Sequence, residues 1–137
     1  MSTWLIKSEP DSYSWDEMVR DGRTVWNGVR NHQAAANLRS MAIGDRALFY
    51  HSNIGKQAVG IVEIVRGHFV DPTDPTGKFV AVEVAAVEPL KRPVTLAEIK
   101  ADPRFADLKL VTQSRLSVVP VGDAHWTAII ALSRQAG

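Results

Sequence analysis

The fold is decided by residues 58–87, which read AVGIVEIVRGHFV (58–70), DPTDPTG (71–77), K (78) and FVAVEVAAV (79–87). Apolar and β-branched residues dominate the two outer segments, and such residues favour strands over helices. The segment between them is rich in Asp, Pro and Gly, which are typical of turns. The stretch therefore predicts two strands that pair back on one another across a turn, the first of them long enough to bend.

Further strands are predicted on both sides of this hairpin, where the sequence shows short runs rich in apolar and β-branched residues. The first run ends at a proline, and the residue before a proline is pushed toward extended geometry. The segment around Trp26 has no such run and is predicted to be irregular. The additional strands are expected over residues 3–8, 46–52 and 116–121.

Helices are predicted where capping residues open a segment. The sequences SWDE (14–17) and TLAE (95–98) match the capping box, in which a hydroxyl and a carboxylate three residues apart each accept from the other residue's backbone amide. Short helices are expected to follow, to about residues 20 and 100. Asn31 is a good N-cap for another helix, and Asp123 for a terminal one. A loop rich in Leu and Lys is expected before residue 116.

Together these elements predict the fold class. Five to six strands with short helices between them, and no regular alternation of strand and helix, are typical of a mainly antiparallel α+β domain, either a bent sheet or a small barrel. The 137 residues suffice for one domain with one core, so a single domain over residues 1–137 is expected. A dinucleotide-binding fold is disfavoured because no GxGxxG motif is present.

Composition excludes several classes of function. The chain has no cysteine, which rules out disulfides, thiolate nucleophiles and cysteine metal sites. Its net charge of +1, from 16 Lys+Arg against 15 Asp+Glu, argues against binding nucleic acid through bulk charge. The four histidines lie far apart, so no metal and no cofactor is expected. No apolar run approaches ~20 residues, and we expect a cytoplasmic monomer without membrane contact.

Two short segments combine large aromatic residues with small polar ones, WNGVRN (26–31) and LFYHS (48–52). Aromatic residues in a core normally have aliphatic neighbours, whereas amides, hydroxyls and imidazoles must be hydrogen-bonded if they are buried. The mixture suits a pocket for a flat polar ring. A nucleobase fits this description, because its face can stack on an aromatic side chain while donors and acceptors bind its edge.

Trp26 is the tryptophan expected to contact a ligand. It falls in a predicted loop, where a bulky aromatic ring needs a docking surface or a ligand. Asn27, Arg30 and Asn31 beside it can bind the edge of a base. The remaining tryptophans fall in a predicted strand or predicted helices and are assigned to the core: Trp4, Trp15 and Trp126.

Four sequence blocks resemble the EVE domain family: KSEP (7–10), WNGVRN (26–31), the pair GD (44–45) with FYHS (49–52), and RLSV (115–118). They occur in the family's order, and the resemblance runs over nearly the whole chain. It implies a PUA-like pseudo-barrel, related to YTH and ASCH domains. It also implies a pocket for a modified base, a modified cytosine or adenine of DNA or RNA.

Carried over residue by residue, the resemblance implies a pocket for a base extruded from its strand. The base would stack on Trp26 near Tyr50, and polar side chains would bind its edge. Arg30 and Lys7 are candidates for phosphate contacts. The implied pocket lining is Ser8, Glu9, Trp26, Asn31, Tyr50, Ser52, Arg115 and Ser117.

The chain departs from the family pattern at two positions. The family often has an aromatic residue after the asparagine and an arginine three residues further on, whereas this chain has His32 and Ala35. Loss of that arginine is expected to weaken a phosphate contact.

Two other functions stay open beside a non-catalytic reader. An enzyme acting on a nucleotide or a modified RNA would use Glu9, His51 and Arg115 as acid, base and charge stabiliser. A protein-interaction module would show no affinity for nucleic acid. Turnover that depends on His51 would favour the enzyme, and partners that co-purify would favour the interaction module.

Overall fold

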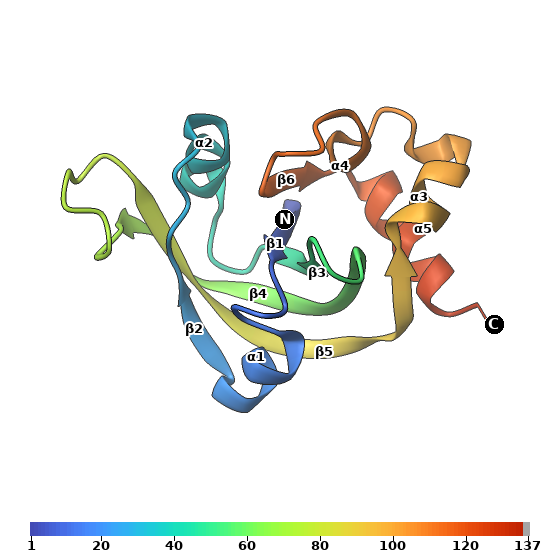
Figure 1. Ribbon diagram of the computed structural model, residues 1–137, viewed down its shortest axis with the longest axis horizontal. Helices are drawn as coiled ribbons and strands as arrows, with labels where there is room; N and C mark the ends of the chain where they lie inside the picture. Colours follow the sequence, from blue (N-terminus) through green and yellow to red (C-terminus); the bar gives the residue numbers. More distant parts are fainter. Residues whose placement is uncertain (136–137) are drawn as a thin grey trace.

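The computed structural model of the protein describes residues 1–135, which form a six-stranded sheet surrounded by short helices (Figure 1). The strand order is β2-β5-β4-β3-β1-β6. Strands β1 and β3 pair in parallel, and the other neighbouring pairs in the described residues are antiparallel. The mainly antiparallel α+β prediction is confirmed. The strands are β1 (Thr3–Ser8), β2 (Arg23–Trp26), β3 (Arg46–His51), β4 (Gln57–Val70), β5 (Val80–Thr95) and β6 (Val118–Val121).

The helices cover the ends and edges of this sheet. Figure 1 shows α2 at one end, beside the β4–β5 turn, and α3, α4 and α5 gathered at the other. Both capping boxes are present, and they open α1 and α3 where the sequence predicts these helices. The helices are α1 (Trp15–Asp21), α2 (His32–Ser40), α3 (Leu96–Ala101), the 3-10 turn η1 (Pro103–Phe105), α4 (Lys109–Thr112) and α5 (Asp123–Ser133).

Strands β4 and β5 form the long hairpin of the sheet, and its pairing shifts register several times. Each shift is a bulge or irregularity that bends the strands and increases their twist. Gly60 of β4 allows the close approach of Trp15, because a Cβ at this position would lie 2.4 Å from the indole ring. The hairpin therefore curves around α1, and it continues to Thr95, beyond the predicted end at residue 87.

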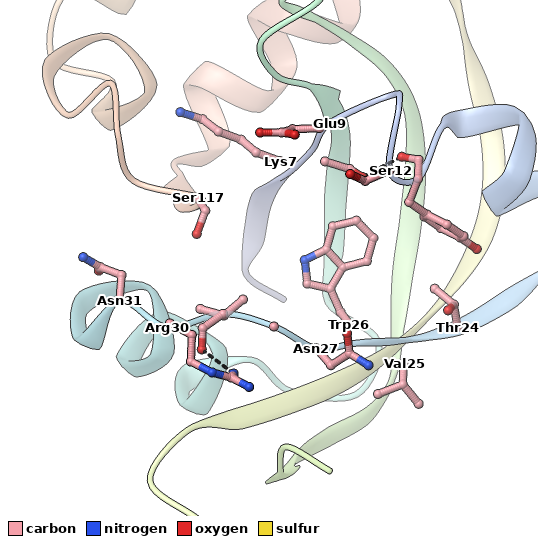
Figure 2. A pocket seen from close by; sticks show the side chains of 14 residues that line it. Lys7, Glu9, Ser12, Thr24, Val25, Trp26, Asn27, Arg30, Asn31 and Ser117 are labelled. Atoms are coloured by element: carbon pink, nitrogen blue, oxygen red, sulfur yellow. Dashed lines mark hydrogen bonds between the residues drawn. The ribbon is translucent and has the colours of Figure 1, made fainter. Parts of the chain in front are cut away.

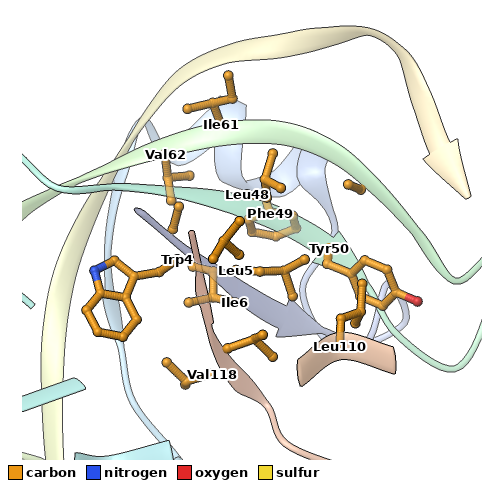
Figure 3. Close-up of a cluster of buried hydrophobic side chains, with 14 of the residues drawn as sticks. Trp4, Leu5, Ile6, Leu48, Phe49, Tyr50, Ile61, Val62, Leu110 and Val118 are labelled. Atoms are coloured by element: carbon orange, nitrogen blue, oxygen red, sulfur yellow. The ribbon is translucent and has the colours of Figure 1, made fainter. Parts of the chain in front are cut away.

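The core lies on both faces of the central strands (Figure 3). Leu5 and Ile6 of β1, and Leu48 and Phe49 of β3, are each fully buried. Since successive residues of a strand point to opposite faces of the sheet, neither face of β1 or β3 meets solvent here. This burial on both faces fixes β1, whose last residues supply one wall of the site.

Three local predictions differ from the structure. Residues 23–26 are not irregular but form β2, which pairs with β5, a partner about 60 residues away that local patterns do not reveal. The expected loop before residue 116 contains η1 and α4. The N-cap of α5 is Gly122 rather than Asp123. No helix within residues 1–135 is long and apolar enough to cross a membrane.

Candidate functional site

A cavity of about 530 Å³ opens between the end of β1, the end of β2 and the segment that leads into α2 (Figure 2). Three strands separate β1 from β2 in the sheet order, so the ends of β1 and β2 meet at the cavity because the sheet curves (Figure 1). Of the ten residues predicted for binding, seven line the cavity: Lys7, Ser8, Glu9, Trp26, Arg30, Asn31 and Ser117.

Trp26 forms the aromatic wall of the cavity. It is the last residue of β2, not a loop residue, and only 9% of its surface is exposed. Its ring packs edge to face against Phe49, with centroids 5.5 Å apart, and against Tyr13 at 6.4 Å. Trp26 therefore belongs to the core and lines the cavity at once, which corrects the expectation that it contacts a ligand instead of the core.

The indole nitrogen of Trp26 is available to a ligand. Its Nε1 makes no hydrogen bond to any of residues 1–135. Every buried polar side-chain atom among these residues has a hydrogen-bond partner, so Nε1, which has none, must be accessible to solvent. Figure 2 shows this edge of the indole turned toward Ser117 and Asn31. The wall offers a hydrogen-bond donor in addition to an aromatic surface.

Asn31 and Ser117 present polar groups at the opposite side of the cavity. Asn31 is the N-cap of α2, where its Oδ1 accepts from the amide of Ala34 at 2.9 Å. That bond fixes the side chain and leaves its amide nitrogen to donate to a ligand. Ser117 is held through its backbone, because its carbonyl accepts from the amide of Lys7 at 3.0 Å, and its hydroxyl makes no hydrogen bond within the described chain.

Ser8 plays a different part from the one expected. Its hydroxyl donates to the carbonyl of Tyr13 at 2.6 Å, so the proton is already used and the oxygen can only accept from a ligand. The amide of Tyr13 in turn donates to the carbonyl of Glu9 at 2.8 Å. Ser8 thus holds the turn after β1 that carries Glu9 and Tyr13 to the cavity.

Lys7 and Glu9 bring opposite charges to the same wall. Lys7 lies near the end of β1, Glu9 directly follows the strand, and both residues line the cavity. Lys7 Nζ donates to the carbonyl of Ser114 at 2.9 Å, and its partial burial lowers the pKa of the amine below its ordinary value. The Glu9 side chain is exposed and carries no hydrogen bond in the described chain.

Arg30 is tied to a buried carboxylate instead of pointing freely to solvent. Its Nη1 lies 2.9 Å from Oδ2 of Asp71, whose side chain is fully buried, and its Nη2 donates to Thr73 at 3.0 Å. The amide of Gly28 donates to the same Asp71 oxygen at 2.8 Å, from a backbone with φ of 80° that glycine adopts without strain. This arrangement balances the charge of Arg30 within the protein, and its contact with a phosphate stays a prediction.

Hydrogen bonding keeps Asp71 ionised. Burial raises the pKa of this carboxyl, but the bonds from Thr73, Arg30 and Gly28 outweigh burial and lower the pKa to about 2. Asp71 lies in the turn of the β4–β5 hairpin. It therefore fastens this turn to the segment that forms the floor of the cavity.

The other three predicted residues lie outside the cavity lining. Tyr50 is only 2% exposed and belongs to the core, and burial raises the pKa of its hydroxyl to about 12. Ser52 pairs with β1 through its backbone amide, which donates to the carbonyl of Ser8 at 2.9 Å. Arg115 is exposed and lines a neighbouring depression that also includes Asn31. The alternation of side chains along a strand explains why Tyr50 is buried, since a residue in the middle of a buried sheet faces one layer of the core or the other.

The grouping expected for an enzyme is not assembled. Of Glu9, His51 and Arg115, only Glu9 lines the cavity. His51 Nε2 accepts from the amide of Trp15 at 3.0 Å, which places the ring at the start of α1. Ala35 is fully buried, so position 35 does not face a phosphate in this chain.

Several lining residues are absent from the prediction. Tyr13 is the most informative, because its ring contacts Trp26 and its hydroxyl donates to Asp21 at 2.8 Å. An aromatic residue directly before a capping box was the available signal. Ser12 lies in the turn after β1, where its amide donates to the carbonyl of Glu9. The remaining ones depend on the unpredicted β2 and its exit: Thr24, Val25, Gly28 and Val29.

Residues 2–132 match the EVE domain family. Human thymocyte nuclear protein 1 is 30% identical over 168 aligned residues, which cover 98% of this chain and 75% of the human protein. The similarity therefore includes every segment that lines the cavity.

Solved structures share the fold. A protein of Rhodopseudomonas palustris is 50% identical, with a TM-score of 0.92 over 97% of this chain and 93% of its own. Human THYN1 protein, solved in complex with DNA containing 5-methylcytosine, is 29% identical with a TM-score of 0.93 and full coverage of both chains. A YTH domain from Zygosaccharomyces rouxii, 17% identical with a TM-score of 0.59 over 99% of this chain and 88% of its own, shares the fold alone.

Proposed function

The chain belongs to the EVE domain family, and on that premise we propose that it is a reader of modified nucleobases. In this proposal a base extruded from DNA or RNA enters the cavity beside Trp26. The relative solved with DNA containing 5-methylcytosine matches this chain over its full length. The proposal rests on the PUA-like fold and on the cavity within it.

The single observation that carries the proposal is the pairing of an aromatic wall with unused polar groups in one cavity. Trp26 is fixed by Phe49 and Tyr13, so its ring is ready for a flat ligand without prior reordering. Opposite it lie the amide nitrogen of Asn31 and the hydroxyl of Ser117. A nucleobase needs both kinds of group, one for its face and the other for its edge.

Extrusion of a base costs a few kcal/mol of unstacking and unpairing. Stacking on an aromatic side chain typically returns about 1–3 kcal/mol per base, and edge hydrogen bonds add to it. Val29 gives the cavity an apolar group, beside which a methyl group on the base can be buried. One buried methyl contributes only ~0.8 kcal/mol, roughly fourfold in affinity, so we expect modest selectivity for the modified base.

We propose binding without chemical change, rather than catalysis. Acid-base chemistry needs two groups within reach of the reacting atoms, and in this chain His51 and Arg115 lie outside the cavity that holds Glu9. The amide of Trp15 already donates to the accepting nitrogen of His51. The partner in this proposal is modified DNA or RNA.

The test is a calorimetric titration with short single strands that differ at one base: 5-methylcytosine, N6-methyladenine, or their unmodified parents. We expect preferential binding to one modified strand. Ser117→Ala should weaken that binding several-fold, because an edge contact is lost, while the melting temperature stays within about 1 °C. Ser40→Ala, at an exposed serine on α2 away from the cavity, is the matched control. Absence of binding to all four strands would contradict the proposal.

A further inference from the structure

An exposed aromatic stack lies beside the cavity and has no part in binding the extruded base. The ring of His32 stacks on Phe79, with centroids 5.1 Å apart and planes inclined by 26°. His32 is exposed and directly follows Asn31, which lines the cavity. The stack therefore sits at the cavity rim, where the start of α2 meets the turn of the β4–β5 hairpin.

Arg30 supports this stack from the cavity side. Its guanidinium carbon lies 5.5 Å from the centroid of the Phe79 ring, a distance at which a cation is attracted to an aromatic face. Asp71 holds the guanidinium in place and balances its charge. The assembly of Arg30, Phe79 and His32 is thus fixed by an ion pair with a buried carboxylate and presents no excess charge from Arg30.

We propose that the His32–Phe79 stack is a second platform, on which the nucleotide next to the extruded base stacks its own ring. The inference rests on the proposed function, since only an extruded base brings its neighbour to this rim. Extrusion leaves the neighbour with one unstacked face, and an exposed aromatic surface is the group that can cover it. The balanced charge of Arg30 fits a neutral ring better than a phosphate.

The residue at position 32 is a histidine, and its imidazole supplies a flat ring at the rim of the cavity. A flat ring, and not a charge, is the property that the platform requires. A phenylalanine at position 32 should therefore preserve its function, whereas an alanine should abolish it.

The probes separate stacking from phosphate contacts. One trinucleotide carries 5-methylcytosine between two thymidines, and a second has the same phosphates but abasic sugars in place of both thymidines. The wild-type chain should bind the first about fivefold more tightly, the lower end of what one stacked base contributes. Replacing each neighbour separately identifies the side on which the platform lies. Equal affinity for the two trinucleotides would overturn the platform.

The experiment compares the wild-type chain with three variants. His32→Ala should remove the difference between the two trinucleotides, and His32→Phe should keep it. His68→Ala, at an exposed histidine of β4, should behave as wild type. If His32→Phe binds as weakly as His32→Ala, the platform is overturned, because a ring alone then does not suffice.

A nucleoside separates this inference from the proposed function. The nucleoside 5-methyl-2′-deoxycytidine should bind wild type and His32→Ala equally, because it has no neighbour. If neither the nucleosides nor the abasic-flanked trinucleotides of 5-methylcytosine and N6-methyladenine bind wild type, the proposed function itself fails. If both bind and the two trinucleotides are equal in affinity, only the platform fails.

Discussion

Two walls of the cavity are built in contrasting ways. The segment that follows Trp26 is fastened by a fully buried carboxylate, Asp71, which binds Arg30 and the amide of Gly28. The loop that leads to Ser117 is held on its outer side by exposed hydrogen bonds, from Lys7 to Ser114 and from Gln33 to Gln113. Buried charge-assisted bonds are costly to break, whereas exposed ones exchange readily with water.

The two walls of the cavity therefore have different roles. The wall that carries Trp26 and Arg30 fixes the shape of the cavity before any ligand arrives. The loop of residues 113–117 can adjust, because its side-chain hydrogen bonds to the rest of the protein are exposed to water. Substitutions in the first wall should therefore lower stability and binding together, and those in the second should change binding with little effect on stability.

The largest effect is expected at Trp26, which belongs to the core as well as to the cavity. Trp26→Ala should lower the free energy of unfolding by about 3–5 kcal/mol, as is usual when a buried tryptophan is truncated. Trp26→Phe should cost much less and keep an aromatic wall without the indole nitrogen. Urea denaturation measures both. A loss below about 1 kcal/mol in Trp26→Ala would mean that the ring is not part of the core.

Asp71 should show the next largest effect. Asp71→Ala leaves the guanidinium of Arg30 without its partner and the amide of Gly28 without its acceptor. Loss of a hydrogen bond to a charged group typically costs about 1.5–3 kcal/mol. Base binding should weaken in the same variant. Asp107→Ala, at an exposed carboxylate, is the matched control. Equal stability of Asp71→Ala and wild type would show that the first wall is not held by this residue.

Acid should weaken the first wall in a defined pH range. The pKa of Asp71 is lowered from an ordinary 3.8 to about 2 in the folded chain, so its stabilisation is complete above about pH 5 and is lost as pH falls through 4 toward 2. The loss amounts to about 2 kcal/mol. Asp71→Asn should show a shallower fall in stability over this range. Identical slopes for the two proteins would contradict the assignment.

The smallest effect is expected in the second wall. Gln113→Ala removes an exposed hydrogen bond of 2.8 Å to Gln33, and such surface changes usually stay within about 0.5 kcal/mol. Thermal denaturation should barely change, while the affinity for a modified strand changes because the loop is released. A destabilisation above about 2 kcal/mol would remove the contrast between the two walls.

Local sequence signals predicted much of the fold. The capping boxes before α1 and α3, the turn at residues 71–77 and the apolar runs of β1 and β4 each depend on neighbours within a few positions. Strand β2 was not predicted, because a four-residue strand is defined by its pairing with β5 across the sheet. The same long-range pairing places Trp26 in the core.

The candidate site was predicted in part for the same reason. The blocks at residues 7–10, 26–31 and 115–118 do meet at the cavity, since β1 and the ends of β2 and the last loop converge there. The block at residues 49–52 does not supply the lining, because Tyr50 lies in the buried middle of the sheet. The partner of Arg30, Asp71, stands some 40 residues away in a turn, where its sequence context indicated only the turn.

The most direct test of the account is the indole N–H spectrum of the ¹⁵N-labelled protein during titration with a single strand that carries 5-methylcytosine. The four tryptophans give four indole signals, and Trp26→Phe identifies the one from Trp26. If the base binds beside Trp26, the Trp26 signal should move most and saturate with the strand, and it should move less with unmodified cytosine. A Trp26 signal that stays unchanged while the strand binds would contradict a base pocket at this wall.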